Sequence, residues 1–471
     1  TRDQERRTFV VRNGKLHPLP EGFLMMAPTQ LAPFVTTRLF SLAGKLRMAL
    51  DLVLPRRRAT DDESLDSFVR RRLGREALER VAQPLVGGIY TADPTRLSLA
   101  AAMPRFIEME RTQRSIILAM RRQARAASRK DSGARWSLFA SFVDGMQTLV
   151  DALARRLPEG AVRLGALVTG LTRTPGGRWR LALAGGDVVE AGQVVLATQA
   201  FATAELLRPH DPMLAEALAA IRYASSAIVT FAYAREQVPH PLDGFGFVVP
   251  AIEGRSVIAG SFTSVKYVGR APVGQVLLRV FVGGALAEHL ATLPDAELVT
   301  VARRELAELL GVQAAPSLVR VHRHLRAMPQ YEVGHLARVA AIETAVDRLG
   351  GVGRAGNGGV RIVGGLTGHA PGRRCLPALI PHRLGEGGDI RREDFSAPMQ
   401  SHQAGATVGE RIGSVAAHAP GFQLHGGQAV AVVAFEPRDR PFAATADAPE
   451  GGVHFLGAGV AADGAHGDVL G

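Results

Sequence analysis

The chain has 471 residues, of which 46% are apolar and 21% are charged, a balance typical of a globular protein with two or three domains. Its one cysteine, Cys375, excludes an internal disulfide and a metal site built from several cysteines, and it favours a reducing compartment. No apolar run approaches the roughly 18 residues that cross a bilayer, so a membrane-spanning class is not expected.

The formal net charge is +12, which predicts an anionic partner such as nucleic acid, lipid headgroups or an acidic small molecule. The basic runs are short and are found at residues 56–58, 70–72, 121–122 and 129–130. None alternates with aromatic residues, which make up only 6% of the chain, so we expect no nucleic-acid groove. Each run is typical of a solvated helix face, and together they would attract an anionic ligand.

The first elements predicted along the chain are a hairpin and three helical stretches. Residues 8–16 indicate two strands joined by an Asn-Gly turn. Residues 41–54 have helical spacing, and residues 60–63 read as a capping box for a helix that follows. A second helical region is expected over residues 99–129.

Residues 83–94 connect these helical regions and contain adjacent glycines, Gly87 and Gly88. Glycines have no Cβ, so the backbone can come close to a neighbour here. Asp93 and Pro94 then predict a turn. Without further information, the stretch is interpreted as a loop between helices with a kink at the glycines.

The second half of the chain changes from strands to a compositionally biased tail. The apolar run at 193–198 is typical of a strand buried on both faces of a doubly wound sheet. One antiparallel sheet is predicted from four strands at residues 228–233, 245–249, 257–262 and 276–282. Beyond about residue 350 helical periodicity fades and seven of the 14 histidines are scattered irregularly, matching no metal pattern. For residues 371–471 this predicts an altered reading frame or an appended, poorly ordered tail.

Residues 83–94, with 106–110 after them, resemble the FAD-dependent protoporphyrinogen/coproporphyrinogen III oxidase family of haem biosynthesis. Further blocks in the family's order stand at residues 12–20, 328–331 and 334–335. The resemblance covers roughly residues 6–350 and is strongest to the soluble bacterial type, which favours coproporphyrinogen III. It implies that the family's N-terminal dinucleotide-binding segment is missing and that the chain diverges after about residue 360.

The resemblance implies an α/β plus α+β fold with a partial, doubly wound FAD-binding domain, a helical domain and an antiparallel substrate-binding sheet. The implied domains are the partial FAD-binding domain at 1–20 and 140–200, the helical domain at 21–139, the substrate-binding domain at 201–335, a return to the FAD-binding domain at 336–370 and the divergent tail at 371–471. Because the glycine-rich turn that grips the pyrophosphate is missing, we expect the chain as given to bind FAD weakly.

The implied activity is FAD-dependent oxidation of a porphyrinogen to the porphyrin, with oxygen as acceptor, in the cytoplasm. The resemblance also allows weak peripheral contact with a membrane, since the helical domain touches the bilayer in membrane-attached relatives. Two alternatives stay open: another amine-oxidase-like flavoprotein, or a non-catalytic remnant that binds a porphyrin. The oligomeric state and the choice between coproporphyrinogen and protoporphyrinogen are not fixed by the sequence.

The resemblance assigns site residues at matching positions. The proposed catalytic position is Gly88, where a backbone carbonyl would accept a pyrrole proton. The proposed substrate-binding residues are Arg7, Gly87, Val248, Ser261 and Phe281, although the bare sequence interprets Phe281 as a core strand residue. The proposed FAD-binding residues are Val168, Ala197, Thr198, Gly356 and Asn357.

Overall fold

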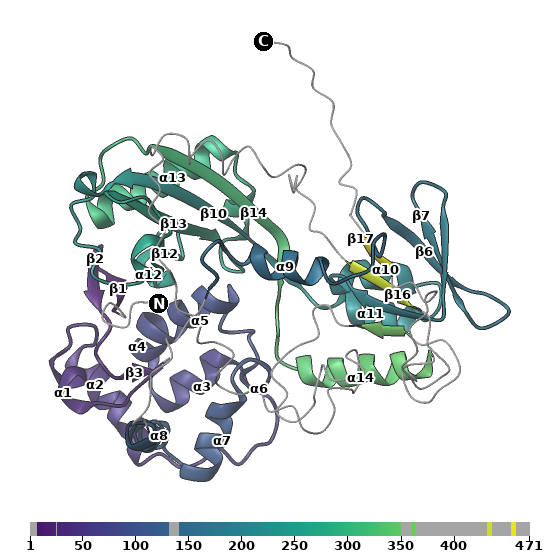
Figure 1. The fold of residues 1–471 in the computed structure, drawn as a ribbon. Coiled ribbons are helices and arrows are strands. Elements are labelled where there is room, and N and C mark those ends of the chain that lie inside the picture. The colour runs from purple at the N-terminus through teal and green to yellow at the C-terminus, as the bar shows by residue number, and fades with distance from the viewer. Residues whose placement is uncertain are drawn as a thin grey trace. The chain divides into compact units, whose positions relative to one another are not determined.

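The computed structural model describes residues 7–24, 26–130, 141–349, 360–362, 431–435 and 454–457 (Figure 1). Gly356 and Asn357 lie outside these residues, and so does most of the predicted tail at 371–471.

A seven-stranded mixed sheet carries the candidate site. Its strands, in order across the sheet, are β14 (Leu318–Pro329), β10 (Tyr223–Ala234), β13 (Gln275–Gly283), β12 (Ala259–Phe262), β11 (Gly246–Val248), β1 (Thr8–Arg12) and β2 (Lys15–Pro18). The four strands predicted to form one sheet do so, and they pair antiparallel. The sheet as a whole is mixed, because β1 pairs parallel with β11.

The N-terminal hairpin forms as predicted, and it belongs to the seven-stranded sheet. Asn13 and Gly14 both have positive φ, 50° and 70°, which the turn requires and these two residue types tolerate. Thr8 pairs with Gly246 of β11. Residues 8–18 therefore belong to the seven-stranded sheet, whereas the sequence had assigned them to the partial FAD-binding domain.

The two faces of this sheet differ. Helix α13 (Asp295–Leu310) packs against one face over β10, β13 and β14 (Figure 1). In β13, Leu278 and Val280 point into that core, while the alternate residues Arg279 and Phe281 are on the other face. That second face carries the candidate site.

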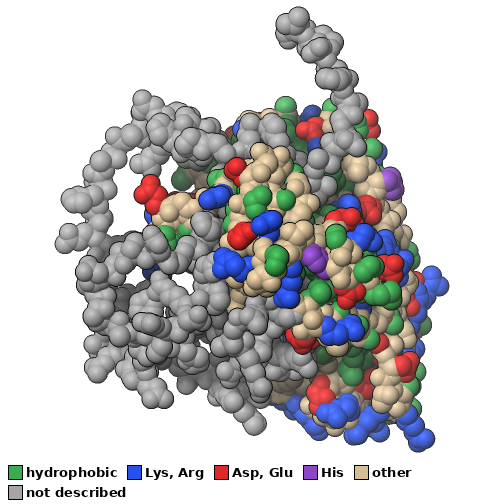
Figure 2. Space-filling view, turned by 90° about the vertical axis from the view of Figure 1, so that its right-hand side faces the viewer, with side chains coloured by type: hydrophobic (Ala, Val, Ile, Leu, Met, Phe, Trp, Pro, Cys, Tyr) green, Lys and Arg blue, Asp and Glu red, His purple; other side chains and the backbone are tan. Residues whose placement is uncertain are grey.

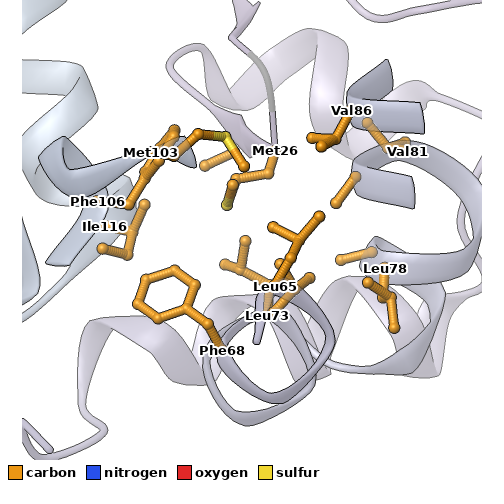
Figure 3. Packing of buried hydrophobic residues seen from close by; sticks show 14 of the residues in the cluster. Met26, Leu65, Phe68, Leu73, Leu78, Val81, Val86, Met103, Phe106 and Ile116 are labelled. Atoms are coloured by element: carbon orange, nitrogen blue, oxygen red, sulfur yellow. The ribbon is translucent and has the colours of Figure 1, made fainter. Parts of the chain in front are cut away.

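Residues 21–130 form a helical layer around one hydrophobic core. Its elements are β3 (Phe23–Leu24), β4 (Ala27–Pro28), α1 (Leu31–Thr36), α2 (Leu42–Ala49), α3 (Leu65–Arg72), α4 (Arg75–Ala77), α5 (Gln83–Tyr90), α6 (Leu99–Ala102), α7 (Pro104–Gln113) and α8 (Ile116–Lys130). Phe68, Leu73 and Phe106 are fully buried in this core and lie close together (Figure 3). The core also includes Val10 and Val248 from the seven-stranded sheet, so it joins the two layers.

Two local predictions for the helical layer are wrong. Helix α3 is capped by Ser64, whose hydroxyl accepts from the Ser67 N–H at 3.2 Å, and not by a capping box at 60–63. The reason is that the side chain of Glu63, the fourth residue of the box, instead accepts hydrogen bonds from the Ser67 hydroxyl and from Arg71. The helical region expected at 99–129 is broken into three helices, because Pro104 starts α7 and Arg114, with φ of 67°, ends it.

The remaining elements surround two smaller sheets. The five-stranded sheet has the order β15 (Val360–Ile362), β9 (Gln193–Ala197), β16 (Ala431–Phe435), β17 (His454–Gly457) and β5 (Val162–Arg163). An antiparallel sheet is formed by β6 (Val168–Arg173), β7 (Trp179–Leu183) and β8 (Val188–Ala191). The helices of this part are α9 (Gln147–Ala154), α10 (Ala200–Leu207), α11 (Pro212–Ala219) and α14 (His335–Arg348), while the short α12 (Thr263–Lys266) follows β12. Two strands of the predicted tail, β16 and β17, are thus paired into a sheet.

Charge is mixed rather than gathered by sign on the face that Figure 2 shows. Arginine and lysine side chains are interspersed there with aspartate and glutamate over the described residues. Among the described residues, no helix is both long and apolar enough to cross a membrane. Within the same residues no group of His, Cys, Asp and Glu could hold a metal ion.

Candidate functional site

The adjacent glycines lie inside helix α5, not in the loop that the bare sequence suggested. The helix continues to Tyr90 and ends because Thr91 adopts the left-handed conformation, with φ of 48°. A Cβ built on Gly88 would lie 3.8 Å from Cγ1 of Val248, which is ordinary contact. Gly88 therefore faces strand β11 of the seven-stranded sheet.

Helix α5 is tied to the sheet by hydrogen bonds at both ends. At its start, Gln83 accepts from the Ala251 N–H at 2.9 Å. At its end, the Gln330 side chain donates to the Tyr90 carbonyl at 3.3 Å, and the Ala285 N–H donates to the Thr91 carbonyl at 2.8 Å. The two sequence blocks at 83–94 and 328–331 thus meet in the structure.

The carbonyls of Gly88 and Ile89 differ from the others in the last turn of α5, because neither accepts a hydrogen bond from the described residues. The Gly87 carbonyl accepts from Thr91, and the Tyr90 and Thr91 carbonyls accept from Gln330 and Ala285. Among the described residues, no hydrogen-bond donor reaches the Gly88 carbonyl. Helix C-termini leave their last carbonyls without intrahelical partners, so this oxygen is available as an acceptor.

One cross-strand row connects Gly88 to the open end of the sheet. The strand registers place side by side, on one face, Val10, Val248, Ala259, Phe281, Ile228 and His322. Val10 and Val248 are buried against the helical layer, Phe281 is half-buried and His322 is exposed. The helical layer therefore covers one end of the row and leaves the other end accessible.

Three of the predicted substrate-wall residues share this face. Phe281 and Val248 lie in the row, and Ser261 lies in the next row, opposite Arg279 and Gly246. Phe281 points away from the core under α13 and is not one of its buried residues, so its interpretation as core is wrong. Its role as a substrate wall stays a prediction that this placement favours.

Arg7 is engaged elsewhere. Its guanidinium forms an ion pair with Asp243, and its carbonyl accepts from the Phe245 N–H at 2.8 Å. The next residue, Thr8, begins the row that contains Ser261. The structure therefore places Arg7 beside the sheet but gives its charge a partner within the protein.

The residues predicted to bind FAD are distributed around the smaller sheets. Val168 is buried at the start of β6, and Ala197 is exposed at the end of β9. Thr198 is buried and its hydroxyl contacts that of Thr203, so its polar atom is used internally. The exposed end of β9 suits one wall of a flavin site, since ligands bind beyond the carboxyl ends of strands in open α/β sheets. The described residues include no strand, glycine-rich turn and helix that would grip a pyrophosphate.

The sequence analysis missed four basic residues on the same face as Phe281. They are Arg279, Arg320, His322 and His324. A signal was visible in residues 319–322, where apolar and basic residues alternate as in a strand with one solvent-exposed face. The basic runs considered in the sequence consist of adjacent residues, whereas these basic residues recur at every second position of a strand.

The site offers walls and positive charge rather than a nucleophile. The row and its neighbour through Ser261 contain no acidic residue among the described strands. The nearest tyrosine, Tyr90, donates to the Ala102 carbonyl at 3.1 Å, and burial raises the pKa of its phenol. Such a site can orient a flat, anionic ligand but leaves demanding chemistry to a cofactor.

The mixed sheet, with one face covered by α13 and the other open, belongs to a fold similar to that of a flavin-dependent oxidoreductase. The chain belongs to the flavin containing amine oxidoreductase family, whose sequence profile matches residues 1–358. This family membership implies FAD as the cofactor.

The similar proteins within that family include coproporphyrinogen III oxidases. The chain is 33% identical over 341 residues to the enzyme of Bacillus subtilis, covering 72% of each chain. It is 35% identical over 368 residues to that of Propionibacterium freudenreichii, covering 72% of this chain and 69% of the relative. A chloroplastic protoporphyrinogen oxidase of Oryza sativa is 30% identical, covering 73% and 66%.

Solved structures support the same fold. A proposed protoporphyrinogen oxidase from Exiguobacterium superposes with a TM-score of 0.65 at 28% identity, covering 76% of this chain and 75% of that one. Reduced UDP-galactopyranose mutase gives a TM-score of 0.50 at 14% identity, which shows likeness of fold alone.

Proposed function

We propose that this chain oxidises a porphyrinogen, coproporphyrinogen III or protoporphyrinogen IX, to the porphyrin with FAD as cofactor and oxygen as final acceptor, as a step of haem biosynthesis. The observation that carries the proposal is the row that begins beside Gly88 and continues through Val248 to Phe281 on one sheet face. The similarity to coproporphyrinogen III oxidases supports it.

In this proposal the macrocycle lies on the open part of the sheet face, next to helix α5, because α5 itself touches the sheet at Val248. Phe281 provides apolar contact for a pyrrole ring, and Val248 closes the covered end of that surface and excludes water from it. Gly87 and Gly88 carry no side chain, so the ring can approach the helix backbone closely. Ser261, in the neighbouring row, lines the side of the same surface.

The protein's part in proton transfer is assigned to one atom. Each two-electron oxidation removes a hydride from carbon and a proton from a pyrrole nitrogen. Bound FAD would supply the acceptor for the hydride and the route for its electrons to oxygen. The free carbonyl oxygen of Gly88 is the proposed acceptor for the pyrrole N–H hydrogen bond, a position from which the proton leaves to water.

We place the protein in the cytoplasm, with weak peripheral contact to a membrane through its helical layer. Exposed apolar side chains on and near α1 and α2 support that contact: Leu31, Val35, Leu42, Leu46, Leu50 and Val53. Arg38 and Lys45 supply positive charge in the same segment for anionic headgroups.

The experiment is to add FAD and coproporphyrinogen III to the purified chain in air and follow the fluorescence of the porphyrin product. Oxidation above the rate without protein, lost in Gly88→Val, would establish the activity. A second candidate is a porphyrin-binding remnant, which is favoured by the internal use of the Thr198 hydroxyl, at one of the predicted FAD-binding residues. Tight coproporphyrin III binding without FAD binding or oxidation would establish the remnant instead.

A further inference from the structure

A stripe of four basic side chains, the cationic stripe, lies beside Phe281. It consists of Arg279 on β13 and Arg320, His322 and His324 on β14. All four are exposed. Strand register puts them on the same sheet face as Phe281, because Arg279 and Arg320 both lie opposite Thr230, and His322 lies opposite Ile228.

The alternate residues of β14 point the other way and are used structurally. Val319 and Val321 pack against the core under α13. Arg323 pairs with Asp295 of α13 and donates to the Leu293 carbonyl. Between Leu318 and His324, the strand thus directs Arg323 toward α13 and its other three basic residues to the opposite face, so the cationic stripe lies on one face only.

The cationic stripe has no internal counter-charge among the described residues. None of its four side chains forms a hydrogen bond or ion pair there, in contrast to Arg71, Arg72 and Arg255, each of which binds carboxylates. Desolvation and the nearby His322 lower the pKa of the His324 imidazole. The guanidinium groups of Arg279 and Arg320 face an open surface.

The spacing suits a macrocycle with short acidic arms. Arg279 is two residues from Phe281 along β13, which is about 7 Å on the same face. His322 is two strands from Phe281, about 10 Å. A ring stacked over Phe281 and Ile228 would therefore extend its side arms toward Arg279 on one edge and β14 on another.

We propose that the cationic stripe binds propionate carboxylates of the porphyrinogen and selects the tetracarboxylate coproporphyrinogen III over the dicarboxylate protoporphyrinogen IX. This inference rests on the proposed function, since it uses the same sheet face. Protoporphyrinogen carries vinyl groups in place of two propionates, so it has fewer carboxylates to pair with the stripe. Exposed charge pairs are individually weak, and the selection comes from adding several of them at one edge of the ring.

The test is a binding titration of the full chain with the stable porphyrins coproporphyrin III and protoporphyrin IX, followed by porphyrin fluorescence. The double variant Arg279→Ala/Arg320→Ala should bind coproporphyrin III about tenfold more weakly, equivalent to about 1.4 kcal/mol, and protoporphyrin IX about twofold more weakly. High salt should weaken coproporphyrin III binding to the wild type more than protoporphyrin IX binding.

The matched control is Arg304→Ala, which removes an exposed arginine from α13 on the opposite side of the sheet and should change neither affinity. Arg279→Lys/Arg320→Lys keeps both charges and should bind coproporphyrin III more tightly than the double alanine variant. If the double variant does not fold, Arg320→Ala alone and the salt series on the wild type carry the same test.

The outcomes separate the two proposals. Equal wild-type affinities for the two porphyrins, or unchanged coproporphyrin III affinity in the double variant, would overturn the role of the cationic stripe and leave the proposed function standing. Failure of the wild-type chain to bind either porphyrin would overturn both.

Discussion

Two arginines, Arg72 and Arg279, show how differently the helical layer and the sheet face use charge. Arg72 is fully buried in the helical layer and donates from Nε to Asp51 at 2.8 Å. The same carboxylate accepts from the Ser115 hydroxyl and the Ile117 N–H. Arg279 lies exposed on the sheet face with no partner among the described residues.

This comparison shows that a charged side chain is not by itself a sign of a functional residue in this chain. Removing an ion from water is costly unless it is paired and hydrogen-bonded, so Arg72 persists only inside a completed network. Arg279 remains hydrated and needs no partner for the fold. The net charge of +12 therefore combines structural arginines with others that are free for a ligand.

The largest expected effect comes from breaking the buried network. Asp51→Ala removes the shortest carboxylate contact of the buried Arg72 and leaves only the longer one to Glu110, so the free energy of unfolding should fall by about 3–5 kcal/mol. Urea denaturation followed by circular dichroism measures it. Glu108→Ala breaks an exposed pair with Arg111 and should leave the denaturation midpoint nearly unchanged. A small loss for Asp51→Ala would mean that the network is not tightly formed.

His335 tests a buried group that lacks a partner. It is fully buried, neither ring nitrogen is hydrogen-bonded within the described residues, and burial together with Arg338 lowers the pKa to about 4 despite the opposing effect of Asp62. Between about pH 6.5 and pH 4 the unfolded chain binds more protons than the folded chain. The free energy of unfolding should therefore decrease as the pH is lowered across that window, by about 3 kcal/mol at most.

The measurement is a series of urea denaturations of the wild type and His335→Leu from pH 7 to pH 4. The variant should lose this component of the pH dependence, since it has nothing to titrate at that position. Parallel stability profiles for the two proteins would show that His335 titrates normally.

Gly88 tests whether α5 lines the ligand surface. Gly88→Val places a β-branched side chain between the helix and the sheet and should weaken coproporphyrin III binding by about tenfold or more. Gly88→Ala adds a Cβ that the structure accommodates at 3.8 Å from Val248 and should fold with unchanged stability. Fluorescence titration and thermal denaturation give the two readouts. Full affinity in a folded Gly88→Val protein would remove α5 from the site.

Phe281 tests the open end of the row with the smallest expected effect. Phe281→Ala should weaken coproporphyrin III binding about fivefold, roughly the 1 kcal/mol of one aromatic contact. Because the side chain is only half-buried, the melting temperature should change little. Leu278→Ala, on the covered face of the same strand, should do the reverse. A large loss of stability in Phe281→Ala would return Phe281 to the core.

The sequence predicted strands better than it predicted where strands associate. The alternation in β13 and the Asn13–Gly14 turn are local signals, and both elements form as expected. The pairing of Thr8 with Gly246 joins residues far apart in the chain, and no local pattern encodes it. Residues 8–18 were for that reason assigned to the wrong sheet.

The candidate site could be predicted only in part for the same reason. Val248, Ser261 and Phe281 were identified by resemblance, and register alone brings them to one face. The helix through Gly87 and Gly88 was missed because glycine disfavours helix interiors, and packing against the sheet overrides that preference here. Which carbonyls at the end of α5 stay free depends on where the distant residues Gln330 and Ala285 donate, so the free Gly88 carbonyl could not be predicted.

The central claim is that one sheet face beside Gly88 binds the porphyrinogen, and a crystal structure of the full chain with coproporphyrin III tests it most directly. The account predicts a macrocycle against Phe281 and Val248, one pyrrole nitrogen near the Gly88 carbonyl and at least one propionate at Arg279 or Arg320. A porphyrin bound elsewhere, with this face empty, would contradict it.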